Sequence, residues 1–110
     1  DHVNAHGTGT KLNDTAEAKA IARVFAHRLP VVSTKCYTGH TLAAAGAIEA
    51  VFSAMAIEEG WIPPALGSEP RDADVPLHVP TTRTNGRFRR VLSNSFAFGG
   101  NNVSVLLGSS

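Results

Sequence analysis

The apolar residues of the chain fall into short runs separated by polar, glycine-rich or proline-rich segments. Residues 3–5 form one brief extended stretch, and residues 31–33 form another directly after Pro30. Two β-rich runs, 91–96 and 103–107, close the chain and are joined by a loop that contains two glycines, which is typical of a hairpin. The pattern therefore predicts four short strands, the last two antiparallel.

A first helix is expected between the first two strands. Asp14 and Glu17 have the spacing of a capping box, which predicts that the helix begins there. His27 and Arg28 suit its C-terminal end, because cations are favoured in the last turn of a helix. The residues that follow the capping box at helical spacing form its expected apolar face: Ala20, Ile21, Val24 and Phe25.

A second helix is expected after Thr41, which we predict as its N-cap. Ile48, Val51, Phe52 and Met55 recur at helical spacing, and residues 43–47 line the other faces with alanine and glycine. Gly60 and the following proline pair end the helix. A helix that is apolar on nearly all sides is expected to be buried.

The elements follow the order strand, helix, strand, helix, long connection and hairpin. Residues 65–87 form the connection, with a short edge strand expected at 77–79. This order predicts one α/β domain over residues 1–110, in which helices pack on a mixed sheet. In such folds the functional loops lie at the ends of strands.

Composition narrows the function classes. The chain is 43% hydrophobic and 17% charged with a net charge of +1, which indicates a globular domain. Basic residues are scattered apart from those at 87, 89 and 90, and one Trp and one Tyr offer little base stacking, so nucleic acid is not expected as a partner. The longest apolar run, 42–57, is too short for a membrane span and is interrupted by Glu49.

Two further features concern the context of the chain. Its single cysteine, Cys36, excludes an internal disulfide and suits a reducing compartment, so we expect a cytoplasmic protein. The sequence begins with Asp1 rather than with methionine and has no leader, which predicts a piece of a longer protein.

Three polar, glycine-containing segments adjoin the predicted strands, at residues 4–10, 33–40 and 94–100, and we expect them to line one pocket. Their His-Gly-Thr-Gly-Thr (6–10), Lys-x3-Gly-His (35–40) and Phe-Gly-Gly (98–100) sequences resemble the motifs of β-ketoacyl-ACP synthases of the two-histidine type. The order and spacing of the motifs also match, and the resemblance extends over essentially the whole chain.

The resemblance implies the C-terminal half of a thiolase-like fold. It also implies a condensing enzyme of fatty-acid or polyketide synthesis, which transfers an acyl group to a cysteine and joins it to the carbanion left when malonyl-ACP loses carbon dioxide. The family's nucleophilic cysteine lies in the N-terminal half, outside this sequence. Cys36 stands where the family usually has Ser.

The family pattern assigns roles to individual positions. His6 and His40 match the two histidines that donate hydrogen bonds to the developing enolate oxygen. Lys35 matches the lysine that holds the histidine network, and we expect it to pair with Glu49 beneath His40, since an unpaired buried carboxylate is costly. The N–H of Phe98 matches one donor of the oxyanion hole, and its ring is expected to gate the acyl pocket.

The resemblance also implies partners. Thr8 and Thr10 match residues that bind the phosphopantetheine arm of acyl carrier protein, while neighbouring glycines let the arm pass. The expected partners are this carrier protein, the N-terminal half of the synthase and a second subunit in a homodimer or heterodimer. No cofactor and no metal are expected.

Several alternatives remain beside this interpretation. His2 and His6 lack the further ligands of a metal site, and residues 7–11 lack the order of a phosphate-binding loop. Cys36 is more simply a buried apolar group than a nucleophile, and Glu17 is more simply a capping carboxylate than a catalytic one. Two alternative functions are a non-catalytic partner subunit, of a type that often loses a histidine, and a module that only binds the carrier arm.

Overall fold

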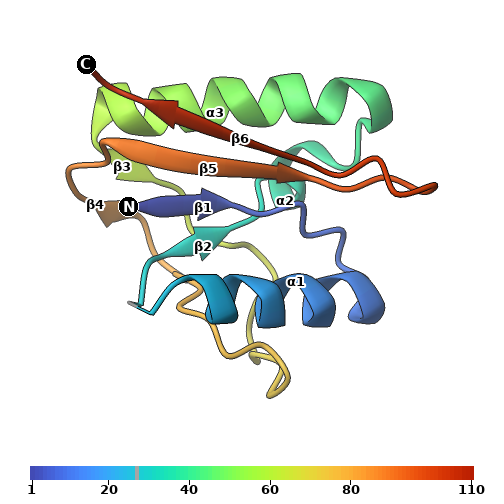
Figure 1. The fold of residues 1–110 in the computed structure, drawn as a ribbon. Coiled ribbons are helices and arrows are strands. Elements are labelled where there is room, and N and C mark those ends of the chain that lie inside the picture. Colours follow the sequence, from blue (N-terminus) through green and yellow to red (C-terminus); the bar gives the residue numbers. More distant parts are fainter. Residues whose placement is uncertain (27) are drawn as a thin grey trace.

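The computed structural model describes residues 1–26 and 28–110 (Figure 1). It contains the four predicted strands in one mixed sheet with the order β2-β1-β5-β6. Strand β1 runs parallel to both of its neighbours, and β5 and β6 form the predicted antiparallel hairpin. The strands are β1 (His2–Asn4), β2 (Val31–Val32), β5 (Arg90–Ser95) and β6 (Val103–Gly108).

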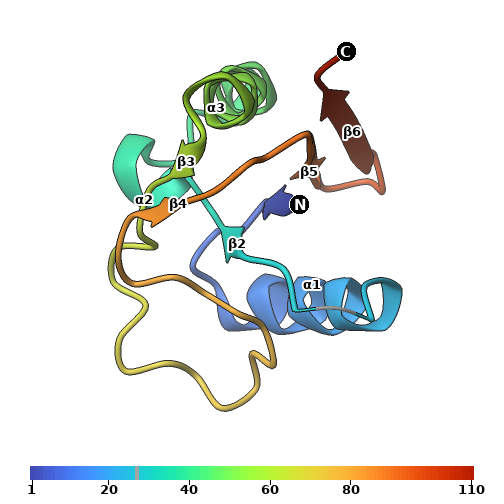
Figure 2. The same ribbon diagram turned by 90° about the vertical axis from the view of Figure 1, so that its left-hand side faces the viewer.

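Helices cover both faces of this sheet, as the two views show (Figures 1 and 2). Helix α1 (Lys11–Val24) lies on one face and α3 (Ala45–Glu59) on the other. The core on the α1 side includes Val3, Ala18, Ile21, Val31 and Leu77. The core on the α3 side includes Val32, Ala56, Ile62, Phe88 and Val91. The predicted α/β class, with helices packed on a mixed sheet, is therefore confirmed.

Helix α1 begins earlier than the capping box predicted. Its first residue is Lys11, and neither Asp14 nor Glu17 caps it, because both lie within the helix. The buried positions of α1 are Glu17, Ala18 and Ile21, whereas Ala20 and Val24 of the predicted apolar face are exposed. The expected C-terminal residue His27 lies outside the described residues, and Arg28 follows the end of the helix.

The second predicted helix begins with a 3-10 turn, and a further short helix lies in the expected loop before it. A single turn, α2 (Lys35–Thr38), and a 3-10 turn (Leu42–Ala44) precede α3. Thr41 precedes the 3-10 turn but makes no capping hydrogen bond with its side chain, so it is not the predicted cap of α3. Gly60 ends α3 in the left-handed conformation with φ of 69°, as expected of a glycine at this position.

Only one face of α3 is buried against the sheet, at Ala45, Glu49, Ser53 and Ala56. Val51 is 60% exposed and Met55 45% exposed on the remaining surface of the helix. The expectation that α3 is buried on nearly all sides is therefore wrong for the described chain. An apolar sequence alone does not say which other segment covers it.

The connection between α3 and β5 contains a small second sheet that the sequence did not predict. Strand β3 (Trp61–Ile62) pairs antiparallel with β4 (Thr84–Asn85). The guanidinium of Arg83 lies 4.3 Å from the centre of the Trp61 ring, in cation–π contact. The edge strand expected at 77–79 is reduced to a single parallel bridge between Pro30 and His78.

Within the described residues, no helix is both long and apolar enough to cross a membrane.

Candidate active site

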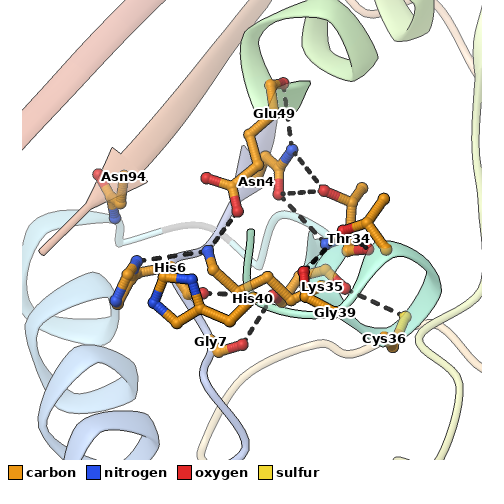
Figure 3. A network of polar contacts seen from close by, with 12 residues as sticks. Asn4, His6, Gly7, Thr34, Lys35, Cys36, Gly39, His40, Glu49 and Asn94 are labelled. Carbon is orange, nitrogen blue, oxygen red and sulfur yellow. Dashed lines mark hydrogen bonds and ion pairs between the residues drawn. The ribbon is translucent and has the colours of Figure 1, made fainter. Parts of the chain in front are cut away.

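The carboxyl ends of β1, β2 and β5 bring the three polar segments together, but segments 4–10 and 33–40 line a common cavity that residues 94–100 do not line. Strand β1 leads to His6, β2 leads through Thr34 to Lys35, and β5 leads to Phe96. Because these strands are parallel to one another, their carboxyl ends meet at one edge of the sheet. Figure 3 shows the polar network at this edge, including His6, Lys35, His40 and Glu49.

Lys35 and Glu49 form the predicted ion pair inside the protein. Lys35 is 8% exposed and Glu49 is 2% exposed, and the Lys35 ammonium donates to Glu49 Oε1. The same ammonium lies 3.3 Å from Nδ1 of His6. The pair therefore contacts His6, whereas the prediction placed it beneath His40. An ammonium only donates hydrogen bonds, so Nδ1 of His6 accepts and the proton of the neutral ring is on Nε2.

Burial governs the charge of this network. Burial and the nearby Lys35 and His40 together lower the pKa of His6 to about 4, with burial as the largest cause. His6 is therefore neutral at neutral pH and presents an uncharged donor. Burial raises the pKa of Glu49, while the hydrogen bond and charge of Lys35 act in the opposite direction. Its second oxygen, Oε2, has no hydrogen-bond partner among the described residues.

His40 lies opposite His6 with its ring nearly perpendicular. The two ring centres are 5.4 Å apart at an interplanar angle of 85°. The centre of the Phe96 ring lies 5.5 Å from the centre of the His6 ring. His40 is exposed, and its Nδ1 accepts a hydrogen bond from the backbone N–H of Leu42 at 3.1 Å. Both histidines thus accept at Nδ1, which leaves Nε2–H of each neutral ring available as a donor.

A carboxylate that the sequence analysis assigned to helix capping holds the His6 loop. Glu17 accepts the backbone N–H of His6 at 2.9 Å and that of Gly7 at 3.0 Å. It also accepts a bond from the Asn94 side chain at 3.1 Å. The capping prediction for Glu17 is wrong, since its oxygens bond the loop after β1. Its spacing of four residues from the buried Ile21 was the available signal, because that spacing places Glu17 on the inner face of α1.

Asn4 joins three elements beneath the site (Figure 3). Its side-chain amide donates to Thr34 Oγ1 and to the backbone oxygen of Glu49, each at 3.3 Å. The backbone N–H of Thr34 in turn donates to Asn4 Oδ1 at 3.4 Å. The sequence analysis gave Asn4 no role, although an amide within an apolar strand is a signal that a buried hydrogen-bond partner exists.

An open cavity of about 530 Å³ adjoins the network, and its lining includes Thr8, Lys35, Cys36 and His40. The hydroxyls of Thr8 and Thr10 are 2.8 Å apart and bond each other at the surface. The structure therefore brings Thr8 together with both the lysine and the second histidine, and Thr10 joins them through Thr8.

Phe98 lies apart from the network. Its side chain is fully exposed, and none of the described ring contacts joins it to either histidine. The prediction that its ring closes the pocket is therefore not met within this chain, where Phe96 is the ring against His6. Phe98 belongs to the loop between β5 and β6, which extends beyond the end of the sheet (Figure 1). The role of the Phe98 backbone N–H stays a prediction.

Cys36 also differs from its expectation. It is exposed rather than buried, and its thiol donates to the backbone oxygen of Ser33 at 3.2 Å. Desolvation by its neighbours raises the pKa of this thiol, whereas an activated nucleophile needs a lowered pKa. Among the described residues, no three or more His, Cys, Asp or Glu side chains cluster as a metal site would require.

Comparisons with known proteins agree with this geometry. Residues 1–69 match the family model for the C-terminal domain of beta-ketoacyl synthase. A 3-oxoacyl-[acyl-carrier-protein] synthase 2 from Mycobacterium leprae is 41% identical over 98% of this chain and 26% of its own length. The chain thus spans about a quarter of the length of the curated relatives it matches.

Solved structures give the same result. The ishigamide ketosynthase/chain length factor superposes on all of this chain and 28% of its own, with a TM-score of 0.94 and 41% identity. A second solved structure is that of a type II polyketide synthase acyl-carrier protein in complex with its ketosynthase bound to the hexaketide. The match covers 99% of this chain and 28% of the matched chain, with a TM-score of 0.92 and 31% identity. This chain belongs to the β-ketoacyl synthase family and carries the thiolase-like C-terminal part of its fold.

Proposed function

We propose that this chain supplies the decarboxylating half of a β-ketoacyl-ACP synthase active site. The reaction joins an acyl thioester to malonyl-ACP with loss of carbon dioxide, in fatty-acid or polyketide synthesis. One observation carries the proposal: two imidazoles, 5.4 Å apart, each accept a hydrogen bond at Nδ1 and so direct a donor at Nε2 outward.

The chemistry needs two such donors. When the bond between the malonyl carbon and its carboxylate breaks, carbon dioxide leaves and the electron pair becomes an enolate with negative charge on the thioester oxygen. Positioned N–H groups stabilise this charge in the transition state. His6, with a pKa of about 4, does so as a neutral ring and adds no buried cation beside Lys35.

The enolate carbon then attacks the carbonyl of the acyl thioester. The tetrahedral intermediate expels the thiolate of the nucleophilic cysteine, and the product remains as a β-ketoacyl thioester on the carrier. We propose that the Phe98 N–H donates to the oxyanion of this intermediate together with the N–H of that cysteine, which is supplied by another part of the protein. Thr8 and Thr10 are proposed to bind the phosphopantetheine arm.

The proposed partners follow because this chain supplies the enolate site and another part of the protein supplies the nucleophilic cysteine. They are acyl carrier protein, the N-terminal half of the synthase, and a second subunit that is identical or related. These assignments are supported by the similarity to a 3-oxoacyl-[acyl-carrier-protein] synthase of M. leprae and to the ishigamide ketosynthase/chain length factor. The proposal requires no prosthetic group in this segment, since the carrier's phosphopantetheine holds the substrates, and it places the reaction in the cytoplasm.

The alternative is a non-catalytic partner subunit, as in a chain length factor. Such a subunit has no need of an enolate site, and its histidines are free to be replaced. This chain retains both His6 and His40 together with the Lys35–Glu49 pair. The intact network therefore favours the catalytic subunit.

His40→Ala in the complete synthase tests the proposal. Removing one of two donors to the enolate is expected to reduce carbon dioxide release from malonyl-ACP at least ~100-fold. Transfer of a radiolabelled acyl group to the cysteine should remain measurable, because it does not form an enolate. His78→Ala, which changes a histidine outside the network, is the control. Equal loss of both half-reactions in His40→Ala would show that His40 serves loading or folding instead.

A further inference from the structure

Asn4 is a polar residue at a fully buried position. It is the last residue of β1 and is as inaccessible to water as the neighbouring Val3. Burying a carboxamide costs free energy unless its oxygen and its N–H groups find hydrogen-bond partners, and an apolar side chain avoids this cost. The hydrogen bonds of Asn4 therefore indicate what an apolar residue could not do at this position.

The Asn4 carboxamide bonds the backbone of the two segments that carry the ion pair. Its Oδ1 accepts the backbone N–H of Thr34, the residue directly before Lys35, at 3.4 Å. Its Nδ2 donates to the backbone oxygen of Glu49 in α3 at 3.3 Å. Among the described residues, no other side chain bonds the backbone of both segments. One amide thus sets the separation of the residues whose side chains form the buried pair (Figure 3).

Asn4 is also linked to His6 through its own segment of the chain. The two residues lie two positions apart, and the N–H of Ala5 between them still donates to the backbone of β2 at 2.9 Å. Side chains two positions apart in an extended segment point to the same face. The Lys35 ammonium contacts both Glu49 and Nδ1 of His6. Its position therefore depends on three segments that meet at the Asn4 side chain.

A second buried side chain bonds the same oxygen of Glu49 but joins no other segment to it. Ser53 Oγ donates to the backbone oxygen of Glu49 at 2.8 Å, from four residues later in α3. Because this bond lies within one helix, it does not affect the distance between α2 and α3. The two side chains thus separate the satisfaction of a buried oxygen from the joining of two segments.

We propose that Asn4 is a positioning residue, whose carboxamide sets the spacing of α2 and α3 so that the Lys35 ammonium bridges Glu49 and His6. This inference rests on the proposed function for its catalytic meaning. Without the amide, the ammonium should stay with Glu49, because a hydrogen bond between two charged groups is the stronger one, and withdraw from Nδ1 of His6. His6 then loses the contact that keeps its Nε2–H directed outward.

Asn4→Leu in the complete synthase tests this role, because leucine has a similar size and no hydrogen-bonding groups. The first measurement is the titration of His6 in the ¹⁵N spectrum of histidine-labelled protein, where the His6 signals are those missing from His6→Ala. Burial, Lys35 and His40 lower the pKa of His6 to about 4, while Asp14 acts in the opposite direction. Withdrawal of the Lys35 charge should raise this pKa, so that the ring gains its proton at a higher pH.

Turnover provides the second measurement. The kcat for carbon dioxide release by Asn4→Leu should fall ~10- to 100-fold, the loss typical of a displaced catalytic group. The KM for malonyl-ACP should stay unchanged, because Thr8 and Thr10, the proposed binding residues for the carrier arm, are not displaced. Ser53→Ala is the matched control, since it removes the other side-chain bond to the same oxygen. It should alter neither the titration of His6 nor the turnover.

Three results would overturn the inference. They are an unchanged His6 titration in Asn4→Leu, losses in Ser53→Ala as large as in Asn4→Leu, or a raised KM with an unchanged kcat in Asn4→Leu. If Asn4→Leu does not fold, Asn4→Ser takes its place, because the shorter hydroxyl is polar but does not reach from Thr34 to Glu49. It must then show the raised pKa and the lowered kcat, and the absence of either refutes the role. If the synthase releases no carbon dioxide, the proposed function fails, and the titration of His6 still decides the role of Asn4.

Discussion

Glu49 projects from the inner face of α3, where water does not reach its carboxylate. Among the described residues, Lys35 is the cation that compensates it, and Lys35 also contacts His6. A charge pair of this kind adds little net stability when intact, but removing one partner leaves the other charge buried and unpaired. The pair therefore couples the stability of α3 to the position of His6.

Lys35→Met should for this reason destabilise the protein by about 3 to 5 kcal/mol. The double variant Lys35→Met/Glu49→Leu should recover most of that loss, since no uncompensated carboxylate remains. Urea unfolding followed by circular dichroism measures both. A cost below about 1 kcal/mol for Lys35→Met alone would mean that Glu49 is protonated or solvated in the folded protein.

Buried histidines make the stability depend on pH. Burial lowers the pKa of His2 to about 4, against an ordinary value of 6.5. The unfolded chain therefore binds a proton at His2 between pH 6.5 and 4 that the folded chain does not. Stability should be fully present above pH 6.5 and be lost as the pH falls to 4, by about 3 kcal/mol for this residue.

His2→Gln tests the origin of this slope. A glutamine side chain has an amide donor for the backbone oxygen of Pro30, which His2 Nδ1 contacts at 2.9 Å, but it does not titrate. The dependence of the unfolding free energy on pH between 6.5 and 4 should therefore become shallower in this variant. An identical slope in both proteins would assign the titration to other groups, such as His6.

At the scale of residues, the sequence identified the side chains of the polar network and missed those that hold them in place. His6, Lys35, His40 and Glu49 were found because their spacing resembles a family pattern. Glu17 was missed because its local spacing matches a capping box, and only the folded chain shows that strand β1 ends within reach of its carboxylate. Tertiary hydrogen bonds of this kind leave no periodic pattern.

At the scale of elements, the loop after β1 depends on close packing against the residue that follows β2. Gly7 has a positive φ of 39°, and a Cβ atom placed there would lie 2.4 Å from Cβ of Ser33. The backbone oxygen of Gly7 also accepts the Ser33 hydroxyl at 2.9 Å. Gly9 has a positive φ of 73°, but a Cβ atom there would meet nothing within 4 Å. A side chain at Gly7 would therefore collide with Ser33, whereas a side chain at Gly9 would have free space around it.

Gly7→Ala and Gly9→Ala form a matched pair for this reason. Both should incur the left-handed cost of about 1 to 2 kcal/mol, and Gly7→Ala should add about 1 to 3 kcal/mol from overpacking. Because the overpacking displaces the segment that carries His6, Gly7→Ala should also lower the decarboxylation rate more than Gly9→Ala. Thermal unfolding and carbon dioxide release measure the two effects, and equal losses in both variants would contradict the packing argument.

The elements themselves were predictable where apolar residues form compact runs. All four strands of the main sheet were found in this way, because short apolar runs bounded by glycine or proline have few alternative structures. The 3-10 turn before α3 and the β3–β4 pair were missed. In each case the backbone follows tertiary contacts, such as that of Leu42 with His40 or Arg83 with Trp61, and local propensity does not report them.

At the scale of the whole molecule, the two faces of the sheet differ in how they are covered. On the α1 face, the connection from α3 to β5 contributes Leu77 to the core. On the other face, α3 presents Val51 and Met55 to solvent, and Leu42 precedes them. The hairpin adds Val103 and Val105, which lie on one face of β6, as further exposed apolar side chains. Several large apolar side chains exposed on one side of a molecule are typical of an interaction site.

The 110-residue chain produced alone should therefore self-associate and have no condensing activity. Its apolar α3 surface lacks a covering layer, and its cysteine is the exposed Cys36, whose thiol pKa is raised rather than lowered. Sedimentation velocity should show dimers or larger species, and Val51→Lys/Met55→Lys should shift them toward monomer, whereas Leu12→Lys on α1 should not.

Condensation should appear only when the N-terminal half of a synthase is added or fused, because that half provides the nucleophile in the proposed mechanism. Acyl-ACP elongation assayed with the chain alone, and again after complementation, measures this. Cys36→Ala should leave the complemented activity unchanged. Elongation by the chain alone that Cys36→Ala abolishes would instead identify Cys36 as the nucleophile, and the raised pKa of its thiol would then have to fall when substrate binds.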